Sequence, residues 1–210
     1  MSPYSFPPVF WVTGTDTDVG KTLVSAILTY MLRADYWKPV QCGIIEGTDL
    51  DFIRRLTGLE EKHFHSETHL FAAPLSPHLA AEMEGKRIEL ADFQIPVTNN
   101  KHLIIEGAGG LLVPLNEDAL LIDLMDQTKL PVVIVARSGL GTINHTLLSI
   151  QALRTKGIEI LGVILNGPKN QKNKEAIEHY GQVKVIFELD QLPLVNRETM
   201  EQTIEQWKEQ

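Results

Sequence analysis

Apolar residues along this chain fall into short continuous runs, separated by segments in which apolar positions recur every three or four residues. The short runs predict buried parallel strands at residues 9–13, 37–41, 103–106, 132–136, 160–165 and 183–187. The periodic segments, several opened by Ser, Thr, Asp or Asn, predict helices at residues 21–33, 50–56, 77–83, 122–128, 143–156, 172–180 and 198–208. This alternation indicates an α/β fold, a mainly parallel sheet with helices on both faces, whose ligands bind beyond the carboxyl ends of the strands.

Length and composition suit a single domain over residues 1–210. Of the 210 residues, 43% are apolar and 22% are charged, which is enough to build one core without a second. The polar stretch 57–69 is the segment that we expect to form a surface excursion. It holds the chain's histidine cluster, His63, His65 and His69, for which we expect a solvated loop, with metal binding as the alternative.

Charge and cysteine content narrow the classes of partner. The net charge of −8 disfavours nucleic acid, whose phosphates reward a basic surface, so small molecules are the expected partners. Cys42 is the only cysteine, which excludes an intrachain disulfide and a cysteine-based zinc site and fits a reducing compartment. The apolar stretch 9–12 is too short for a signal-peptide core, and no run approaches a membrane span. We therefore expect a cytoplasmic protein with no membrane partner.

The strongest chemical motif is the segment Val-Thr-Gly-Thr-Asp-Thr-Asp-Val-Gly-Lys-Thr between the first strand and the first helix. It predicts a phosphate-binding loop: Gly20 lets the backbone approach the phosphates, Lys21 reaches the β and γ oxygens, and the Thr22 hydroxyl ligates Mg²⁺. Five residues, not the common four, separate Gly14 from Gly20, and Thr15 stands where the first glycine belongs. The alternative is an ordinary strand-to-helix turn that happens to contain Gly-Lys-Thr.

Three charged residues fall where a nucleotide site needs them. Glu106 precedes Gly-Ala-Gly-Gly, so we expect its carboxylate at a strand end in a small-residue turn, open to a metal or phosphate. Asp49 offers another oxygen for Mg²⁺, or serves only to cap a helix. Lys38, in an apolar strand, either faces a ligand or is an edge lysine whose ammonium reaches water. For Glu106 the alternative is a tight turn with a solvated acid.

Two further segments follow strands. Ser-Gly-Leu-Gly-Thr-Ile-Asn-His at 138–145 offers backbone donors suited to a carboxylate, or forms a glycine turn with a threonine cap. Asn166 and Gly167 end a later strand, where the amide reads a base edge or the pair makes a turn. For each of these two segments, the residue types alone do not decide between ligand binding and a turn.

Taken in order, these motifs resemble those of the dethiobiotin synthetase family over about residues 9–195. The resemblance is carried by Gly-Thr-Asp-Thr-Asp-Val-Gly-Lys-Thr at 14–22, Lys-Pro-Val at 38–40, Pro-Leu-Ser-Pro-His at 74–78, Glu-Gly-Ala-Gly-Gly at 106–110, Gly-Leu-Gly-Thr-Ile-Asn-His at 139–145 and Asn166. The unusual loop spacing is the family's own.

The resemblance implies a P-loop NTPase-like fold and an ATP- and Mg²⁺-dependent cyclo-ligase of biotin synthesis. Its substrates would be ATP, 7,8-diaminononanoate and CO₂ or bicarbonate, and the reaction would be the penultimate step. In the family, one amine takes up CO₂ as a carbamate, whose oxygen attacks the γ-phosphate. The second amine then displaces phosphate from the carbamic-phosphoric anhydride and closes the ring. Family members are homodimers with the active site at the interface.

The resemblance also assigns roles to residues, with Lys21 and Lys38 as catalytic groups and Thr22, Asp49 and Glu106 as metal ligands. The implied ATP-binding residues are Asp18, Val19, Gly20, Lys21, Thr22, Asp49, Glu106, Gly107, Ala108, Gly109, Asn166, Gly167, Leu192, Pro193 and Leu194. The implied substrate-binding residues are Thr17, Asp18, Lys38, Cys42, Gly139, Leu140, Gly141, Thr142 and Asn144, of which the segment 139–144 would reach the substrate carboxylate across the dimer interface.

The chain departs from the family pattern at three places. Cys42 stands where the family usually has a small hydroxyl residue, a stronger hydrogen-bond donor. Asp18 is one methylene shorter than the glutamate of some relatives. The segment 188–193 matches the family only at its proline, so the adenine contacts are the least supported by sequence.

Three other classes of protein compete with the ligase. Partitioning ATPases share the fold, but Asp16 replaces their signature lysine five residues before Lys21. A cobyrinate-type amidotransferase needs a glutaminase domain with its own cysteine, for which no length remains. A nucleotide-sensing module stays open from the loop alone, although it gives no reason for Lys38. ATP turnover that depends on the diamine would favour the ligase, and hydrolysis stimulated by a protein partner would favour the sensor.

Overall fold

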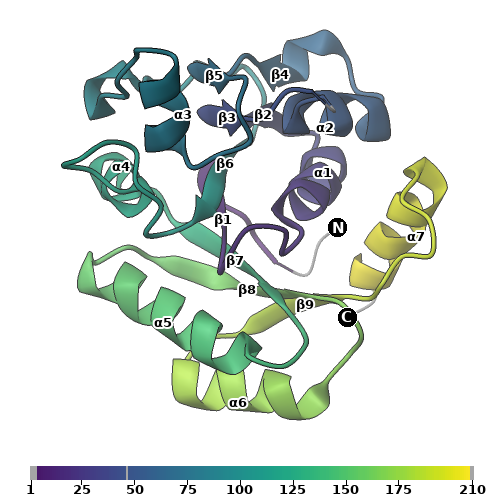
Figure 1. The fold of residues 1–210 in the computed structure, drawn as a ribbon. Coiled ribbons are helices and arrows are strands. Elements are labelled where there is room, and N and C mark those ends of the chain that lie inside the picture. The colour runs from purple at the N-terminus through teal and green to yellow at the C-terminus, as the bar shows by residue number, and fades with distance from the viewer. Residues whose placement is uncertain (1–3, 46, 209–210) are drawn as a thin grey trace.

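The computed structural model describes residues 4–45 and 47–208, which form one α/β domain (Figure 1). The strands are β1 (Val9–Gly14), β2 (Asp35–Trp37), β3 (Val40–Cys42), β4 (Phe64–His65), β5 (His69–Phe71), β6 (Leu103–Gly110), β7 (Val132–Arg137), β8 (Ile160–Asn166) and β9 (Val185–Leu189). The helices are α1 (Lys21–Leu32), α2 (Asp49–Thr57), α3 (Pro77–Met83), α4 (Leu121–Thr128), α5 (Thr142–Thr155), α6 (Gln171–Gly181) and α7 (Arg197–Lys208), with short 3₁₀ helices at Glu61–His63 and Leu90–Asp92. None of these helices is long and apolar enough to span a membrane.

A central sheet of seven strands organises the domain. Its order is β4-β2-β6-β1-β7-β8-β9, and every neighbouring pair is parallel. Strands β3 and β5 pair with each other in a separate two-stranded parallel sheet. The predicted mainly parallel sheet is confirmed, and because its strands share one direction, the segments that follow β1, β6, β7 and β8 meet at one edge.

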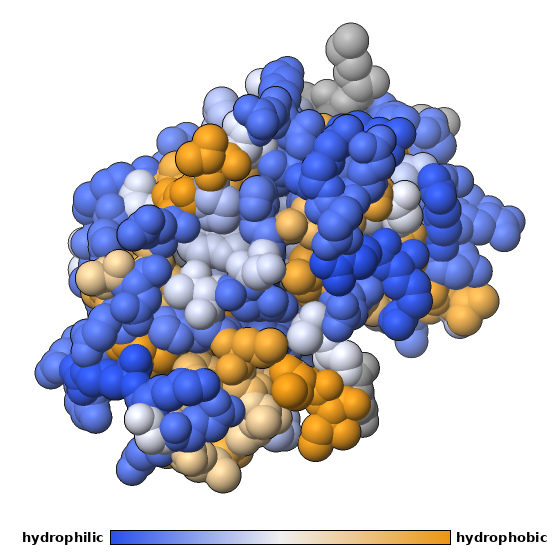
Figure 2. All heavy atoms as spheres, turned by 90° about the horizontal axis from the view of Figure 1, so that it is seen from above, coloured by the Kyte–Doolittle hydropathy of each residue, from blue (hydrophilic) through white to orange (hydrophobic). Residues whose placement is uncertain are grey.

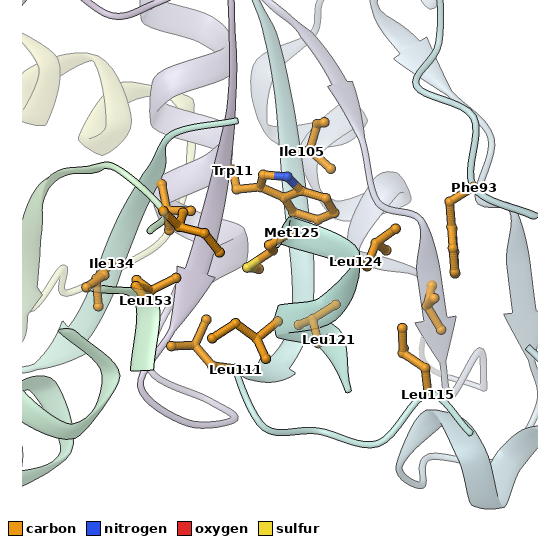
Figure 3. Packing of buried hydrophobic residues seen from close by; sticks show 14 of the residues in the cluster. Trp11, Phe93, Ile105, Leu111, Leu115, Leu121, Leu124, Met125, Ile134 and Leu153 are labelled. Carbon is orange, nitrogen blue, oxygen red and sulfur yellow. The ribbon is translucent and has the colours of Figure 1, made fainter. Parts of the chain in front are cut away.

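Helices cover both faces of the central sheet, as predicted. On one face, Trp11, Ile105 and Ile134 pack against apolar residues of α3, α4, α5 and α6 (Figure 3). On the other face, Val12, Ile104 and other strand residues pack against α1, α2 and α7. Successive residues of β1 and β6 alternate between these two cores because strand side chains alternate in direction. The central strands are therefore buried on both sides.

Three of the predicted strands have clearly different limits in the structure. The predicted strand 37–41 is two strands, because Pro39 lacks the N–H that would continue a ladder, and β3 leaves the central sheet to pair with β5. The predicted turn after Glu106 is wrong, since β6 continues through the small residues to Gly110. Glu106 therefore lies inside a strand and is fully buried. The last strand, β9, begins two residues later than the predicted start at 183.

The solvated loop predicted for the histidines is wrong, because β4 joins the edge of the central sheet beside β2, although residues 58, 60–62, 66 and 68 of this stretch are exposed. His63 is buried, with Nδ1 3.0 Å from the Ala34 carbonyl oxygen and 3.3 Å from Asp35 Oδ1. His65 Nε2 lies 3.2 Å from Asp35 Oδ2. These histidines hold a buried carboxylate in the sheet edge. In residues 4–45 and 47–208, no group of three or more His, Cys, Asp or Glu side chains is arranged to hold a metal ion.

Candidate functional site

The predicted phosphate loop joins β1 to α1 at the carboxyl edge of the central sheet. Gly20 caps α1 at φ 97°, a left-handed conformation that favours glycine. A Cβ atom at Gly20 would lie 2.1 Å from Asn166 Nδ2, so no other residue fits without displacing that amide. The same amide donates a hydrogen bond of 2.9 Å to the Val19 carbonyl oxygen. Asn166, at the end of β8, thus supports the loop from across the sheet edge.

The Lys21 ammonium is turned into the loop. Lys21 is buried, and its Nζ donates a hydrogen bond of 2.8 Å to the Asp16 carbonyl oxygen. Burial lowers the pKa of Lys21, and the nearby Glu106 charge only partly opposes that shift. The Asp16 carboxylate receives a hydrogen bond of 3.1 Å from Arg137, at the end of β7. Sequence reasoning missed Arg137, although a cation at a strand end beside the loop was a signal that could have found it.

Lys38, Asp49, Glu106 and Thr22 converge beside Lys21, although they come from four different segments. Lys38, between β2 and β3, donates a hydrogen bond to Asp49 Oδ2, and its Nζ lies 3.8 Å from Glu106 Oε1. Thr22, in the first turn of α1, donates a hydrogen bond of 3.0 Å to the same Glu106 oxygen. Lys38 therefore faces the site and is not the edge lysine of the alternative interpretation. Its ammonium neutralises two carboxylates there.

Burial and charge set the protonation of these groups. Burial opposes the charge of Lys38, but Glu106 and Asp49 outweigh this effect and raise the pKa of Lys38. Burial also opposes the charge of Asp49, yet the ammonium and hydrogen bond of Lys38 hold the pKa of Asp49 below its ordinary value. For the fully buried Glu106, burial dominates and raises the pKa. The cluster thus keeps a cationic lysine beside an ionised Asp49.

Tyr36 is a member of this cluster that sequence reasoning missed. It is fully buried in β2, and its hydroxyl donates a hydrogen bond of 3.0 Å to Glu106 Oε2. Burial and then the Glu106 charge raise the pKa of Tyr36 well above its ordinary value, so the phenol remains a donor. A phenol in an otherwise apolar strand was the only sequence signal.

The donor set suits a small hard cation. Thr22, Asp49 and Glu106 offer a hydroxyl and two carboxylates within one cluster, together with Lys21 for phosphate. Mg²⁺ is commonly held by one or two carboxylates, with phosphate oxygens and waters completing its octahedron. The residues present therefore fit Mg²⁺ bound together with a nucleotide.

The glycine-rich part of β6 lies directly against the loop. Gly109 has φ 67°, and a Cβ there would lie 2.8 Å from Val113 Cγ2 and 3.6 Å from Thr17 Oγ1. A Cβ at Gly110 would lie 3.6 Å from the Thr15 carbonyl oxygen. The loop atoms lie at ordinary van der Waals distance from these two positions, whereas the Val113 side chain leaves no room for a Cβ at Gly109. The structure thus brings Thr17 together with Gly109.

Other predicted site residues lie farther from this cluster or on the surface. Leu192 packs partly against the α1 core, and Pro193 and Leu194 are exposed in the segment between β9 and α7. In the segment 139–144, Leu140 is fully exposed, Gly139, Gly141 and Asn144 are exposed, and Thr142 is buried at the start of α5.

Cys42 lies at the end of β3, at the rim of the cluster. It lines a hollow of about 400 Å³ together with Gly43, Ile45, Gly47 and Pro74. Burial raises the pKa of Cys42 to about 11, against the opposing charge of Lys38, so the thiol is neutral at pH 7. Seen from above, the surface of the molecule shows apolar side chains between polar ones (Figure 2).

Comparison with solved structures identifies proteins of similar fold. A plasmid partition protein from Borrelia burgdorferi bound to AMPPNP matches with a TM-score of 0.57 at 12% identity, covering 96% of each chain. A ParA family ATPase from Chlorobium tepidum matches with a TM-score of 0.55 at 13% identity, covering 97% of this chain and 91% of the other. At such identities the likeness shows the fold alone, and it confirms the P-loop NTPase-like prediction.

Sequence comparison identifies a narrower group. Residues 9–199 match a family model described as an AAA domain. The chain is 53% identical over 190 residues to the ATP-dependent dethiobiotin synthetase BioD of Paramagnetospirillum magneticum, covering 90% of this chain and 91% of the relative. It is 46% identical over 191 residues to the BioD of Lawsonia intracellularis, covering 91% and 92%. The motifs, the fold and this similarity along almost the whole chain lead to one conclusion: the protein belongs to the family of ATP-dependent dethiobiotin synthetases.

Proposed function

We propose that this protein closes the ureido ring of dethiobiotin from 7,8-diaminononanoate and CO₂ with ATP and Mg²⁺, releasing ADP and phosphate. The main observation in support of this proposal is the position of Lys38, which lies with Asp49, Glu106 and Thr22 beside Lys21. A phosphate loop alone serves many functions. A second buried lysine next to it suits a reaction in which an acyl oxygen takes up a phosphoryl group.

Within this proposal, the loop holds the nucleotide. Gly20 and its neighbours Asp18 and Val19 present backbone donors, and Lys21 leaves the Asp16 carbonyl oxygen for the β and γ phosphates. Gly107, Ala108 and Gly109 let the phosphates approach the backbone of β6. Asn166 and Gly167 contact the adenine together with Leu192, Pro193 and Leu194. The location of Asn166 against Val19 supports its part in this set.

Thr22, Asp49 and Glu106 are the proposed ligands of Mg²⁺, which supplies charge to offset that of the transferring phosphoryl group. Asp49 and Glu106, whose carboxylates lie beside Lys38, would then have Mg²⁺ as a second cationic partner. Lys38 turns from Asp49 toward the carbamate and anhydride oxygens and stabilises their negative charge. Phosphoryl transfer requires mainly such positioning and electrostatic stabilisation.

The substrate is proposed to lie between two protomers. Thr17, Asp18, Lys38 and Cys42 face the diamine and its carbamate. Gly139, Leu140, Gly141, Thr142 and Asn144 of the second protomer take the carboxylate at the start of α5, where the helix dipole favours an anion. Support for this interface comes from the exposure of Leu140 and of Leu148 on α5, two large apolar side chains that an interface would bury. The proposed location is the cytoplasm, which keeps Cys42 reduced.

The test is phosphate release with Mg·ATP and bicarbonate, measured with and without 7,8-diaminononanoate and paired with mass detection of dethiobiotin. We expect release that depends on the diamine and is matched by product. Lys21→Ala should abolish turnover, whereas the matched control Lys172→Ala, an exposed lysine on α6, should leave it unchanged. Hydrolysis that ignores the diamine would contradict the ligase and favour a nucleotide sensor.

A further inference from the structure

The two oxygens of the Glu106 carboxylate have different partners. Oε1 accepts the hydrogen bond from Thr22 at 3.0 Å and lies 3.8 Å from the Lys38 ammonium. Oε2 accepts the hydrogen bond from the Tyr36 hydroxyl, also at 3.0 Å. Glu106 is fully buried, so bulk solvent does not reach either oxygen. The orientation of this carboxylate therefore depends on the protein groups that contact it.

The position of Tyr36 follows from the register of the sheet. Strand β2 pairs with β6 so that Tyr36 lies opposite Ile104, two residues before Glu106. Side chains two residues apart in a strand share a face, so the Tyr36 ring and the Glu106 carboxylate lie on the α1 side of the sheet. The ring is fully buried in the core on that side. This packing holds the hydroxyl at one place.

We propose that Tyr36 is a positioning residue for the metal site: its hydrogen bond to Oε2 holds the Glu106 carboxylate so that Oε1 faces Thr22. The inference rests on the proposed function, in which Thr22 and Glu106 are Mg²⁺ ligands. Without the hydroxyl, the carboxylate rotates away from Thr22 toward the Lys38 ammonium. Residues that orient a metal ligand in this way typically change metal affinity by about 10- to 100-fold when they are removed.

The test uses Tyr36→Phe, which deletes only the hydroxyl. We would measure the Kd of the full chain for AMPPNP by calorimetry, in Mg²⁺ and in EDTA. The expected result is a loss of about tenfold in the Mg²⁺-dependent gain in affinity, with the Kd in EDTA unchanged. The matched control is Tyr30→Phe, since the Tyr30 hydroxyl also donates to a glutamate, Glu201, but lies outside the site. Tyr30→Phe should behave as the wild type.

The Mg²⁺ dependence of turnover is a second measurement, and it would not change if Tyr36 had only a structural role. In Tyr36→Phe, the Mg²⁺ concentration for half-maximal turnover should rise about tenfold, while saturating Mg²⁺ restores the maximal rate. If Tyr36 acts through Glu106, then adding Tyr36→Phe to Glu106→Gln should cause no further loss of Mg²⁺-dependent affinity. If Tyr36→Phe alone folds poorly, the comparison of Glu106→Gln with the double variant still tests the inference. In both of these variants the buried charge at position 106 is absent.

The outcomes separate the two proposals. If Mg²⁺ raises the AMPPNP affinity of the wild type and of Tyr36→Phe equally, the role of Tyr36 is overturned. The proposed function would remain. A wild type whose AMPPNP affinity ignores Mg²⁺ would overturn the metal assignment, and the role of Tyr36 with it. A further loss in the double variant relative to Glu106→Gln would also overturn the inference, since Tyr36 would then act independently of Glu106.

Discussion

Replacing Lys38 tests how the buried cluster balances its charges. Lys38→Met keeps the apolar stem and removes the ammonium that neutralises Asp49 and Glu106. Asp49 is 30% exposed and regains water, but Glu106 is fully buried and keeps only the weaker effect of the Lys21 charge. We therefore expect Lys38→Met to abolish turnover and also to lower the free energy of unfolding, by an amount that depends on pH.

The distance and the burial set the magnitude. At 3.8 Å, and with an effective dielectric constant of about 20, the attraction between Lys38 and Glu106 is roughly 4 kcal/mol. The variant can limit this loss by protonating Glu106. For a carboxyl with an ordinary pKa of about 4.3, protonation costs about 3.7 kcal/mol at pH 7 and about 1 kcal/mol at pH 5. The expected loss of stability is thus about 3.5 kcal/mol at pH 7 and about 1 kcal/mol at pH 5.

The sign follows from linkage. In the variant the pKa of Glu106 rises further above its unfolded value, so the native state binds an extra proton, and stability falls as pH increases through the raised pKa. Urea unfolding of both proteins from pH 5 to pH 8 measures the difference. The control is Lys62→Met, which removes an exposed lysine paired with Glu60 and should leave the stability almost unchanged at every pH. A loss for Lys38→Met that is absent, or equal at pH 5 and pH 8, would refute the reasoning.

Three other substitutions test separate features. Gly20→Ala should weaken AMPPNP binding at least about tenfold and lower the stability by about 1–3 kcal/mol, because it combines a left-handed φ with a clash against Asn166. Calorimetry measures the binding and thermal unfolding measures the stability. Wild-type affinity would contradict the loop assignment. Asp35→Ala should lower the free energy of unfolding by about 3 kcal/mol and the Tm by roughly 6–12 °C, because it breaks a buried hydrogen-bond network. The control Asp190→Ala, at an exposed position, should leave the Tm unchanged. Equal Tm values for the two variants would contradict this prediction. Leu140→Asp should shift sedimentation toward monomer and weaken diamine binding more than AMPPNP binding; a dimer of unchanged stability would place the interface elsewhere.

The loop and the sheet core are visible in local sequence, because glycine spacing and apolar runs report directly on backbone conformation and burial. The segment around Pro39 shows the limit of that logic. A proline does mark the end of a ladder, yet only the pairing of β3 with β5 shows where the chain goes next. Likewise, the small residues after Glu106 suggest a turn locally, but they form an irregular part of β6, whose pairing with β1 resumes at Gly110 after a register shift. Neighbouring strands override local preference in both places.

For this protein, the sequence by itself determined the alternation of strands and helices, the phosphate loop and the family, since each depends on residues that are close along the chain or on their order. Only the tertiary structure decided that Lys38, Asp49 and Glu106 form one charged cluster, that Tyr36 supports it, and that His63 and His65 hold Asp35. The physical reason is that these groups interact through space across parallel strands. Their charge states and hydrogen bonds depend on burial and distance, which no local pattern encodes.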